Sequence, residues 1–359
     1  MEPAARDVRD LCRRALAGDL LGEPDLARLL AAHGEAAEAV FAAARAARAR
    51  SFGDAVFLYG FVYFSTFCRN ECTFCFYRAG NGESPRYRKS LDEVVAICRD
   101  LAGSGVVLLD LTMGEDPAIH DDPEYAALLE LVAAVREASG LPVMISPGVV
   151  PDDVLAGLRA RGADWYALYQ ETHTPELYRR LRTGQPFAAR AAARSAARRA
   201  GLLVEDGILT GIGDVAADRA HSIASMRAAA WEQVRVMTFV PQSGTPLADA
   251  QTSGDEAELL AIAAMRLAMP HALIPASLDV DGIRGLERRL NAGANVVTSI
   301  VPPTVGLAGV SQAELDIDEG RRTVAGVLPH LARLGLRPGT VAEYRAWLAE
   351  AHGRAQVPA

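Results

Sequence analysis

Eight short apolar or β-branched runs alternate with longer amphipathic segments between residues 56 and 300 of this 359-residue chain. The short runs predict strands, and the segments between them have the spacing of helices that bury one face. Such alternation is typical of a parallel sheet built from strand–helix units, and eight units are enough to close a barrel. The predicted strands are residues 56–64, 106–112, 142–146, 164–169, 204–210, 234–240, 272–278 and 295–300.

The intervening segments predict the helices of the same barrel. We therefore expect the α/β class and a (β/α)8 TIM-type barrel. In such a barrel the residues that carry chemistry lie at the carboxyl ends of the strands and in the loops that follow. The predicted helices are residues 90–103, 122–139, 151–161, 174–182, 187–200, 217–230, 255–268 and 282–290.

Helical patterns also flank the barrel. Residues 1–50 include helices predicted at 24–33 and 35–48, and we expect this segment to pack outside the barrel and cover one end. Residues 317–356 are predicted to be helical again, and residues 356–359 are expected to fray. The expected division is an N-terminal helical extension (1–50), a barrel (51–335) and a C-terminal helical tail (336–359).

Composition and charge exclude several classes of protein. The chain is 50% hydrophobic and 23% charged, as globular proteins are, and its net charge of −8 gives no support for binding to nucleic acid or an anionic membrane. No apolar run reaches the ~18 residues of a membrane span, and the first residues lack the pattern of a signal peptide. Five cysteines, three of them clustered, do not form a disulfide framework. We therefore expect a cytoplasmic protein.

Three cysteines, Cys68, Cys72 and Cys75, follow the first predicted strand at the spacing C-x3-C-x2-C. Thiolates are soft ligands, and groups of them hold iron–sulfur clusters. Three protein ligands would leave one iron of a cubane open to an external ligand. The alternative is a zinc site or chance clustering, although zinc usually takes four protein ligands and the chain has no second C-x2-C pair. Cys12 and Cys98 lie in helical patterns and are expected to be small buried residues, which disfavours a second cluster for sulfur insertion.

The cysteine spacing, with an aromatic residue before the third cysteine, resembles the motif of the radical S-adenosylmethionine (SAM) enzymes. The resemblance implies a [4Fe-4S] cluster whose open iron chelates the amino and carboxylate groups of SAM. It also implies that Phe74 packs against the adenine. The alternative for Phe74 is ordinary core packing.

Four further residues are candidates for binding SAM. Gly114-Glu115 after the second strand resembles the end of the Gly-Gly-Glu turn that receives the SAM amino group, with Met113 in place of the first glycine. Ser146 and Glu171 follow the third and fourth strands, where each side chain can hydrogen-bond a ribose hydroxyl. Arg190 follows a predicted helix start, and its planar guanidinium suits the SAM carboxylate.

Each of these candidates has a structural alternative. Glu115 and the neighbouring Asp116 suit the start of a helix. Ser146 and Glu171 are residue types common in turns and helix caps. Arg190 lies among other arginines and would then be an ordinary exposed residue.

Charged residues also lie in the sixth predicted strand and directly after the seventh. Arg235 is inside an apolar strand, where a buried charge must be paired, and Asp279 ends Pro275-Ala276-Ser277-Leu278-Asp279. Because alternate side chains of a barrel strand point inward, both are predicted to be inward polar groups that together bind the carboxylate and amino group of an amino acid. The alternative is a structural Arg235–Asp279 ion pair without a ligand.

With these segments in place, the chain resembles the 3-methylornithine synthase family, the radical SAM lysine mutases of pyrrolysine biosynthesis, an amino-acid biosynthesis pathway. The resemblance implies a closed chamber that holds one amino acid. By position, Arg235 would hold the substrate carboxylate, Ser277 and Asp279 its α-amino group, and Asp110 the distal amino group of lysine. Residues 304–307 depart from the usual loop after strand eight, which we expect to close the chamber. The similar segments are residues 64–68, 110–117, 204–213, 237–246, 275–279 and 290–300.

The resemblance further implies that L-lysine is isomerised to 3-methylornithine. A 5′-deoxyadenosyl radical takes a hydrogen from the lysine γ-carbon, the Cα–Cβ bond breaks, the fragments recombine at the neighbouring carbon, and the hydrogen returns. The first electron would come from a donor such as flavodoxin or ferredoxin. The protein must bind, orient and confine the fragments, and no general base is needed.

Two alternatives remain open at this stage. One is a radical SAM enzyme that rearranges a different amino acid, for example an acidic one, which Asp110 disfavours because two carboxylates repel each other. The other is a cluster carrier or scaffold without SAM chemistry.

Overall fold

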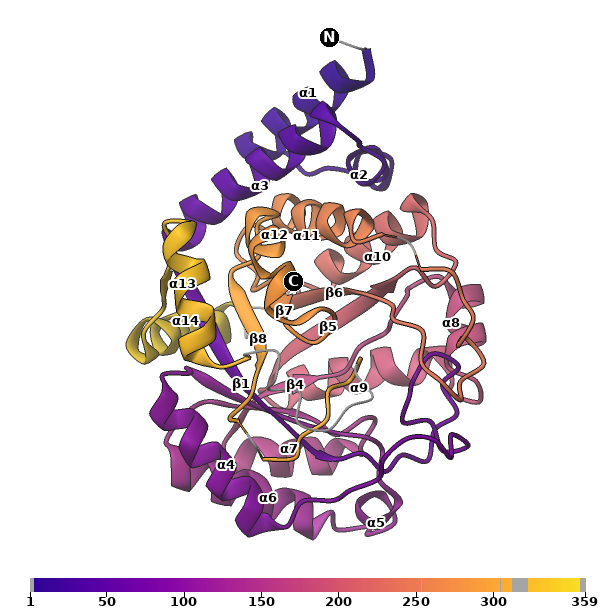
Figure 1. The fold of residues 1–359 in the computed structure, drawn as a ribbon, viewed down its shortest axis with the longest axis vertical. Coiled ribbons are helices and arrows are strands. Elements are labelled where there is room, and N and C mark those ends of the chain that lie inside the picture. Colours follow the sequence, from indigo (N-terminus) through magenta and orange to yellow (C-terminus); the bar gives the residue numbers. More distant parts are fainter. Residues whose placement is uncertain (1–2, 253, 304, 312–321, 356–359) are drawn as a thin grey trace.

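The structure, a computed structural model, describes residues 3–252, 254–303, 305–311 and 322–355. In this part of the chain parallel strands form a sheet in the order β6-β5-β4-β3-β2-β1-β8-β7. The two ends of the sheet meet where Gln233 forms a parallel bridge with Leu273, so the predicted barrel is nearly closed (Figure 1). The strands are β1 (Ala55–Ser65), β2 (Leu108–Met113), β3 (Val143–Ser146), β4 (Ala163–Ala167), β5 (Leu203–Thr210), β6 (Gln233–Thr238), β7 (Pro275–Ser277) and β8 (Val296–Ile300).

Helices surround the sheet at the predicted places. Ser90 shows why one of them starts where it does, because its side chain and that of Glu93 form a capping box at the helix start. Two short elements were not predicted: α5 (Pro117–His120), and the 3-10 turn η1 (Gly282–Gly285) that begins the last barrel helix. The other barrel helices are α4 (Leu91–Ser104), α6 (Ala126–Ser139), α7 (Asp152–Ala160), α8 (Pro175–Leu181), α9 (Phe187–Arg199), α10 (Ala216–Ala228), α11 (Glu256–Ala268) and α12 (Leu286–Asn291).

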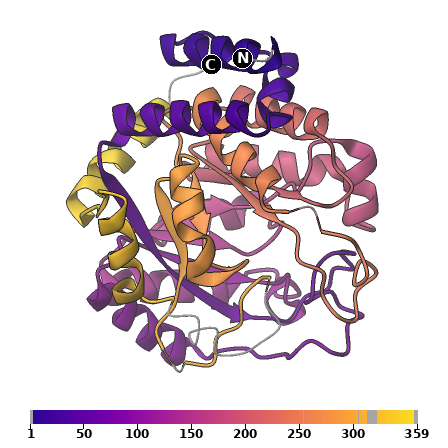
Figure 2. The ribbon, with the colours of Figure 1, turned by 45° about the horizontal axis from the view of Figure 1, so that its top comes forward.

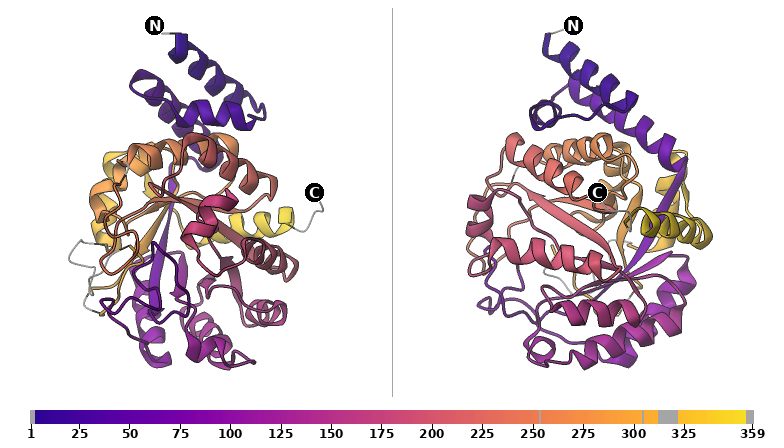
Figure 3. Two further views of the ribbon diagram at one scale, coloured as in Figure 1. Left: turned by 90° about the vertical axis from the view of Figure 1, so that its right-hand side faces the viewer. Right: turned by 180° about the vertical axis from the view of Figure 1, so that it is seen from behind.

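Three N-terminal helices lie outside the barrel: α1 (Pro3–Ala17), α2 (Glu23–Leu30) and α3 (Glu35–Phe52). They pack on α10 and α11, with α1 stacked on α3 (Figures 2 and 3). The segment therefore covers a side of the barrel, and the expectation that it covers an end is wrong. The reason lies in α11, whose residues 258–267 are all buried. A helix that is apolar on both faces needs a second layer outside the sheet.

The C-terminal segment closes the amino-terminal end of the barrel. It contains α13 (Val324–Arg333), a two-residue strand β9 (Arg337–Pro338) beside the start of β1, and α14 (Val341–Ala355). From α14, Tyr344 packs edge-on to Phe57 with ring centroids 5.0 Å apart, and its hydroxyl lies 2.8 Å from that of Tyr59. Residues 317–321 of the predicted helical segment and the tail 356–359 lie outside the described residues.

The interior of the barrel is apolar at this closed end and polar above it. Leu108 and Leu203 belong to the apolar floor. Two residues farther along their strands, on the same face, come Asp110 and Glu205, and Arg235 lies on neighbouring β6. All three charged residues are buried. In the described part of the chain no helix is long and apolar enough to cross a membrane.

Candidate active site

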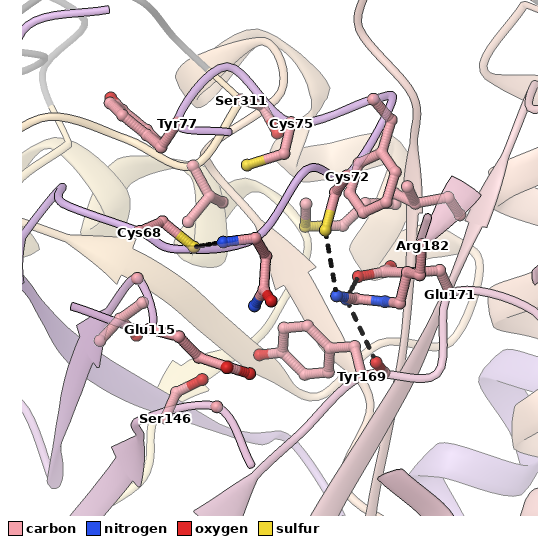
Figure 4. A pocket seen from close by; sticks show the side chains of 18 of the residues that line it. Cys68, Cys72, Cys75, Tyr77, Glu115, Ser146, Tyr169, Glu171, Arg182 and Ser311 are labelled. Carbon is pink, nitrogen blue, oxygen red and sulfur yellow. Dashed lines mark hydrogen bonds and ion pairs between the residues drawn. The ribbon is translucent and has the colours of Figure 1, made fainter. Parts of the chain in front are cut away.

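A cavity of about 190 Å³ lies at the carboxyl ends of the strands. Figure 4 shows the sulfur atoms of the cysteines on one side of it and the Glu115 and Ser146 side chains on the other. The loops after the first four strands and helix α9 supply these groups. The wall includes every residue predicted to bind the cluster or the cofactor: Cys68, Cys72, Cys75, Phe74, Glu115, Ser146, Glu171 and Arg190.

The three clustered cysteines are free thiols in the loop that follows β1. Burial raises the pKa values of Cys68 and Cys75, so a metal must displace their protons to bind. Among the described residues, no three metal-binding side chains surround the position of a single ion. A zinc site requires such convergence, whereas a cubane offers a separate iron to each thiolate. Three free thiols from one loop at the wall of a cavity are a donor set that fits a cluster with one iron left open.

The cysteine loop is held against the turn after β2. The Arg69 N–H donates to the Glu115 carbonyl at 2.9 Å, and the Gly114 N–H donates to the Ser65 carbonyl at 2.9 Å. A Cβ atom on Gly114 would lie 2.3 Å from the Phe67 carbonyl oxygen and 2.9 Å from the Cys68 Cβ. Only glycine allows this approach, which explains the glycine of the turn motif.

We expect Gly114→Ala to lower iron incorporation about tenfold or more, because overpacking of ~1–3 kcal/mol would displace the backbone at Cys68. Iron content after anaerobic reconstitution measures the effect, and circular dichroism checks the fold. Gly103→Ala in α4 is the matched control, since a Cβ there meets no atom within 4 Å. Full iron loading of Gly114→Ala would contradict the close approach.

Glu115 faces the cavity as a carboxylate. Its Oε1 accepts from the Val149 N–H and its Oε2 from Arg69 Nε, both at 3.1 Å. Burial opposes its charge, but the Val149 N–H and nearby cations such as Arg190 hold the pKa of Glu115 below its usual range. Asp116 instead caps α5 by accepting from the Ala118 N–H at 3.0 Å. The capping alternative thus holds for Asp116, whereas Glu115 lines the cavity and pairs with Arg69.

Arg190 is buried in the cavity wall, so the exposed-arginine alternative is wrong. Its Nε donates to the Tyr169 carbonyl at 2.8 Å. Within the described residues it has no carboxylate at ion-pair distance, whereas Arg194 on the same helix pairs with Asp206 at 3.2 Å. Burial and the charge of Arg182 lower the pKa of Arg190. A buried guanidinium without a counter-ion fits the carboxylate of a bound cofactor.

Glu171 lies in the cavity wall with a φ of 68°, a conformation rare outside glycine and asparagine. Its side chain forms an ion pair with Arg182. Arg182 Nη1 lies 3.6 Å from the Cys72 sulfur, and its guanidinium carbon lies 5.4 Å from the centre of the Phe74 ring. Arg182 therefore connects the cysteine loop to a predicted ribose ligand (Figure 4). Its role could not be predicted from the sequence, because Arg182 stands at a helix end, two residues after Arg180, without any distinguishing pattern.

The four predicted substrate-binding residues, Asp110, Arg235, Ser277 and Asp279, are buried but do not line this cavity. Two of them lie directly below the wall, since Thr112 and Met237, two residues farther along β2 and β6, belong to it. Asp110 and Arg235 therefore face the barrel interior between the apolar floor and the cavity.

Arg235 and Asp279 do not pair with each other, so the predicted alternative of a shared ion pair is wrong. Arg235 Nε donates to Glu205 Oε1 at 2.8 Å. Asp279 accepts from Arg322 at 3.1 Å and from the Ser311 N–H at 2.6 Å. Strand β5, which carries Glu205, lies next to the strand of Arg235, whereas Asp279 follows β7 and meets the segment after β8.

Asp110 is the titratable carboxyl group of this interior. Burial raises the pKa of Asp110 to about 7, with Glu205 adding to the increase and Arg235 opposing it. The Thr112 hydroxyl donates to Asp110 Oδ1 at 3.1 Å. A nearby ammonium group would stabilise the carboxylate form.

Comparison with known proteins identifies the family of this chain. The sequence profile of the Radical SAM superfamily matches residues 62–226. The 3-methylornithine synthase of Methanosarcina barkeri is 45% identical over 336 residues, which cover 93% of this chain and 95% of that protein. The 3-methylornithine synthase of Methanosarcina acetivorans is 43% identical over 342 residues, 95% of this chain and 97% of that protein.

A solved structure agrees. The crystal structure of methylornithine synthase superposes with a TM-score of 0.89 at 44% identity, covering 94% of this chain and 99% of that one. High identity over nearly the full length of these relatives, with the cysteine motif at the expected place in a matching barrel, leads to one conclusion. The chain belongs to the 3-methylornithine synthase family of radical SAM enzymes.

Proposed function

We propose that this protein is a radical SAM mutase that converts L-lysine into 3-methylornithine. The observation that supports this best is a buried layer of charged side chains, Asp110, Glu205 and Arg235, below the cavity that the cysteine motif lines. With all three ionised, these side chains carry one net negative charge. Lysine, with two ammonium groups and one carboxylate, carries the matching positive charge.

As a radical SAM enzyme, the protein uses a [4Fe-4S] cluster and SAM. Cys68, Cys72 and Cys75 would hold the cluster. When bound, the two cofactors supply a carbon radical that abstracts a hydrogen from the substrate. In the cofactor wall, Glu115 would accept from the SAM amino group and Arg190 would bind its carboxylate. Phe74 would contact the adenine, while Ser146 and Glu171 would contact the ribose.

The substrate residues hold lysine in the layer below. Arg235 binds the α-carboxylate, Ser277 and Asp279 take the α-amino group, and Asp110 binds the distal ammonium. Fixing both ends of lysine presents its middle carbons to the cavity above and keeps the two fragments within reach of each other after the Cα–Cβ bond breaks. The apolar floor and α14 below it exclude water from that end.

Anaerobic incubation of the reconstituted protein with lysine, SAM and reductant tests the proposal. We expect 3-methylornithine as the product by mass spectrometry and NMR. If another amino acid is isomerised and lysine is not, lysine is not the substrate. If no SAM is cleaved at all, the protein is a cluster carrier.

The pKa of Asp110 predicts how lysine binding depends on pH. Burial raises that pKa to about 7 before substrate binds, and the distal ammonium of lysine binds only the carboxylate form. Protonation below pH 7 therefore competes with lysine, and the dissociation constant should rise about tenfold between pH 8 and pH 6. Calorimetric titration at both values measures it. Norleucine, which has the chain length of lysine but no distal ammonium, is titrated as the control and should show no such change in affinity. Equal affinity at the two pH values would show that Asp110 does not meet the ammonium.

The electron donor and the compartment are further parts of the proposal. A buried cluster of this kind needs a one-electron donor of low potential, such as flavodoxin or ferredoxin. Free thiols at all five cysteines suit the reducing cytoplasm. Reduction of the cluster by purified flavodoxin, followed by its electron paramagnetic resonance (EPR) signal, tests the donor.

A further inference from the structure

We propose that Glu205 and Tyr169 form a positioning pair that holds Arg235 with its terminal nitrogen Nη2 free for the substrate carboxylate. This inference rests on the proposed function, because it concerns how the amino-acid chamber selects a carboxylate. Neither residue touches the reacting carbons, so both act through Arg235.

Glu205, Tyr169 and Arg235 each contact the other two. One oxygen of Glu205 accepts from Arg235 Nε at 2.8 Å, and the other accepts from the Tyr169 hydroxyl at 3.0 Å. The guanidinium carbon of Arg235 lies 5.4 Å from the centre of the Tyr169 ring. A carboxylate bound on both oxygens, with a ring beside its partner, leaves the arginine a single orientation.

The backbone is built for this arrangement. In the register of β5 and β6, Gly207 is the partner of Arg235, and Glu205 lies two residues earlier on the same face. A Cβ on Gly207 would lie 3.0 Å from the Tyr169 ring and 3.3 Å from the Arg235 Cβ. Because Gly207 has no side chain, the Tyr169 ring and the stem of Arg235 can occupy this space.

The arginine keeps one group unsatisfied. Arg235 is only 5% exposed, and its Nη2 has no hydrogen-bond partner in the described part of the chain. A buried donor without an acceptor is costly, and a substrate carboxylate would satisfy it. Since Glu205 takes the Nε side, the open donor lies at the end of the guanidinium.

Glu205 and Tyr169 also keep Arg235 from pairing with Asp110. Asp110 and Arg235 are close enough for Arg235 to oppose the rise in the pKa of Asp110. Without Glu205, Arg235 would be free to turn toward Asp110 and neutralise it. Both ends of lysine would then lose their binding partner, so Glu205 keeps the two charged groups separate.

The test compares lysine with lysinamide, which has a neutral amide in place of the carboxylate. Binding is measured by calorimetry on the reconstituted protein with SAM and without reductant, so that no turnover is needed. We expect Glu205→Gln to weaken lysine binding about 30-fold and lysinamide binding about threefold or less, since only lysine uses the oriented arginine. In turnover, KM for lysine should rise more than kcat falls.

Two further variants sharpen the test. Tyr169→Phe removes one hydroxyl and should give a smaller loss of about three- to tenfold, again for lysine and not for lysinamide. Glu232→Gln is the matched control, because it makes the same change in a buried carboxylate that pairs with the partly exposed Arg198, directly before β6. It should leave the lysine-to-lysinamide ratio unchanged.

The pH dependence of lysine binding gives a second test, because a purely structural role of Glu205 would not change its midpoint. Because the charge of Glu205 contributes to the raised pKa of Asp110, the midpoint of lysine binding should shift to lower pH in Glu205→Gln. Equal losses for lysine and lysinamide in Glu205→Gln would overturn the positioning role. If that variant does not fold, the ratio in Tyr169→Phe decides.

Different results would contradict the proposed reaction and the positioning role. Lysine that binds to the wild type but yields no 3-methylornithine would remove the proposed reaction and leave the positioning role standing on the binding ratios. A wild type that binds lysine and lysinamide equally would remove the role of Arg235 and this inference with it.

Discussion

Asp110→Asn is expected to lower kcat/KM for lysine by about 100-fold or more, because an amide cannot neutralise an ammonium in a buried chamber. The loss should appear mainly in KM, since the distal amino group is bound before and during the reaction. SAM binding should stay intact, because Asp110 does not line the cofactor cavity. Turnover and SAM affinity, measured anaerobically on the same preparation, give the two numbers.

Thr112→Val is the control for this change. It removes the hydroxyl that donates to Asp110 and keeps the carboxylate, so it should cost far less than Asp110→Asn. An Asp110→Asn enzyme that still turns over lysine would mean that the distal ammonium lies elsewhere. A gain of activity on an acidic amino acid would favour the alternative substrate class.

The charges of the chamber explain why lysine is favoured over an acidic substrate. Asp110 and Glu205 face one arginine, Arg235, and the carboxylate of Asp279 is already paired with Arg322. A bound dicarboxylic amino acid would add two carboxylates to those of Asp110 and Glu205, with only Arg235 and its own α-ammonium to balance the four. Removing charges from water is costly unless they are paired, so the net charge of the chamber selects a substrate with an additional ammonium.

Most of the barrel could be predicted from the sequence, because strands buried on both faces give continuous apolar runs such as Val56–Phe64. What the sequence did not show was where separate layers meet. The position of α1–α3 depends on the outer face of α11, and apolar residues all round a helix do not say which layer covers it. Strand β9, with two residues, is too short to give a pattern.

The sequence could predict that most of these residues lie around one cavity, because they stand at the carboxyl ends of strands or in the loops that follow, and parallel strands bring those positions to one end. Glu205 was missed although a signal existed. The argument that a buried arginine needs a partner applies equally to a carboxylate inside apolar β5, the neighbouring strand. The structural alternative in the sequence analysis paired Arg235 with Asp279, because sequence cannot fix which inward side chains are within reach of each other. Arg182 gave no signal, since its role comes from the fold of the loop after β1.

Arg182→Gln is expected to raise the dissociation constant of SAM about 100-fold, because it leaves the buried Glu171 carboxylate without its counter-ion. The reduction potential of the cluster should also change. Arg182 Nη1 lies 3.6 Å from the Cys72 sulfur, and a cation beside a cluster ligand stabilises the reduced state. We therefore expect a more negative reduction potential. SAM binding by equilibrium dialysis and EPR-monitored redox titration measure the two effects.

Arg179→Gln is the matched control, because Arg179 lies on the same helix but is exposed and pairs only with exposed Glu176. It should change neither quantity. The double variant Glu171→Gln/Arg182→Gln separates the two causes. Removing both partners relieves the unpaired charge, so the double variant should regain thermal stability relative to Arg182→Gln while its reduction potential stays low. A wild-type potential in Arg182→Gln would show that the arginine serves only Glu171 and does not act on the cluster.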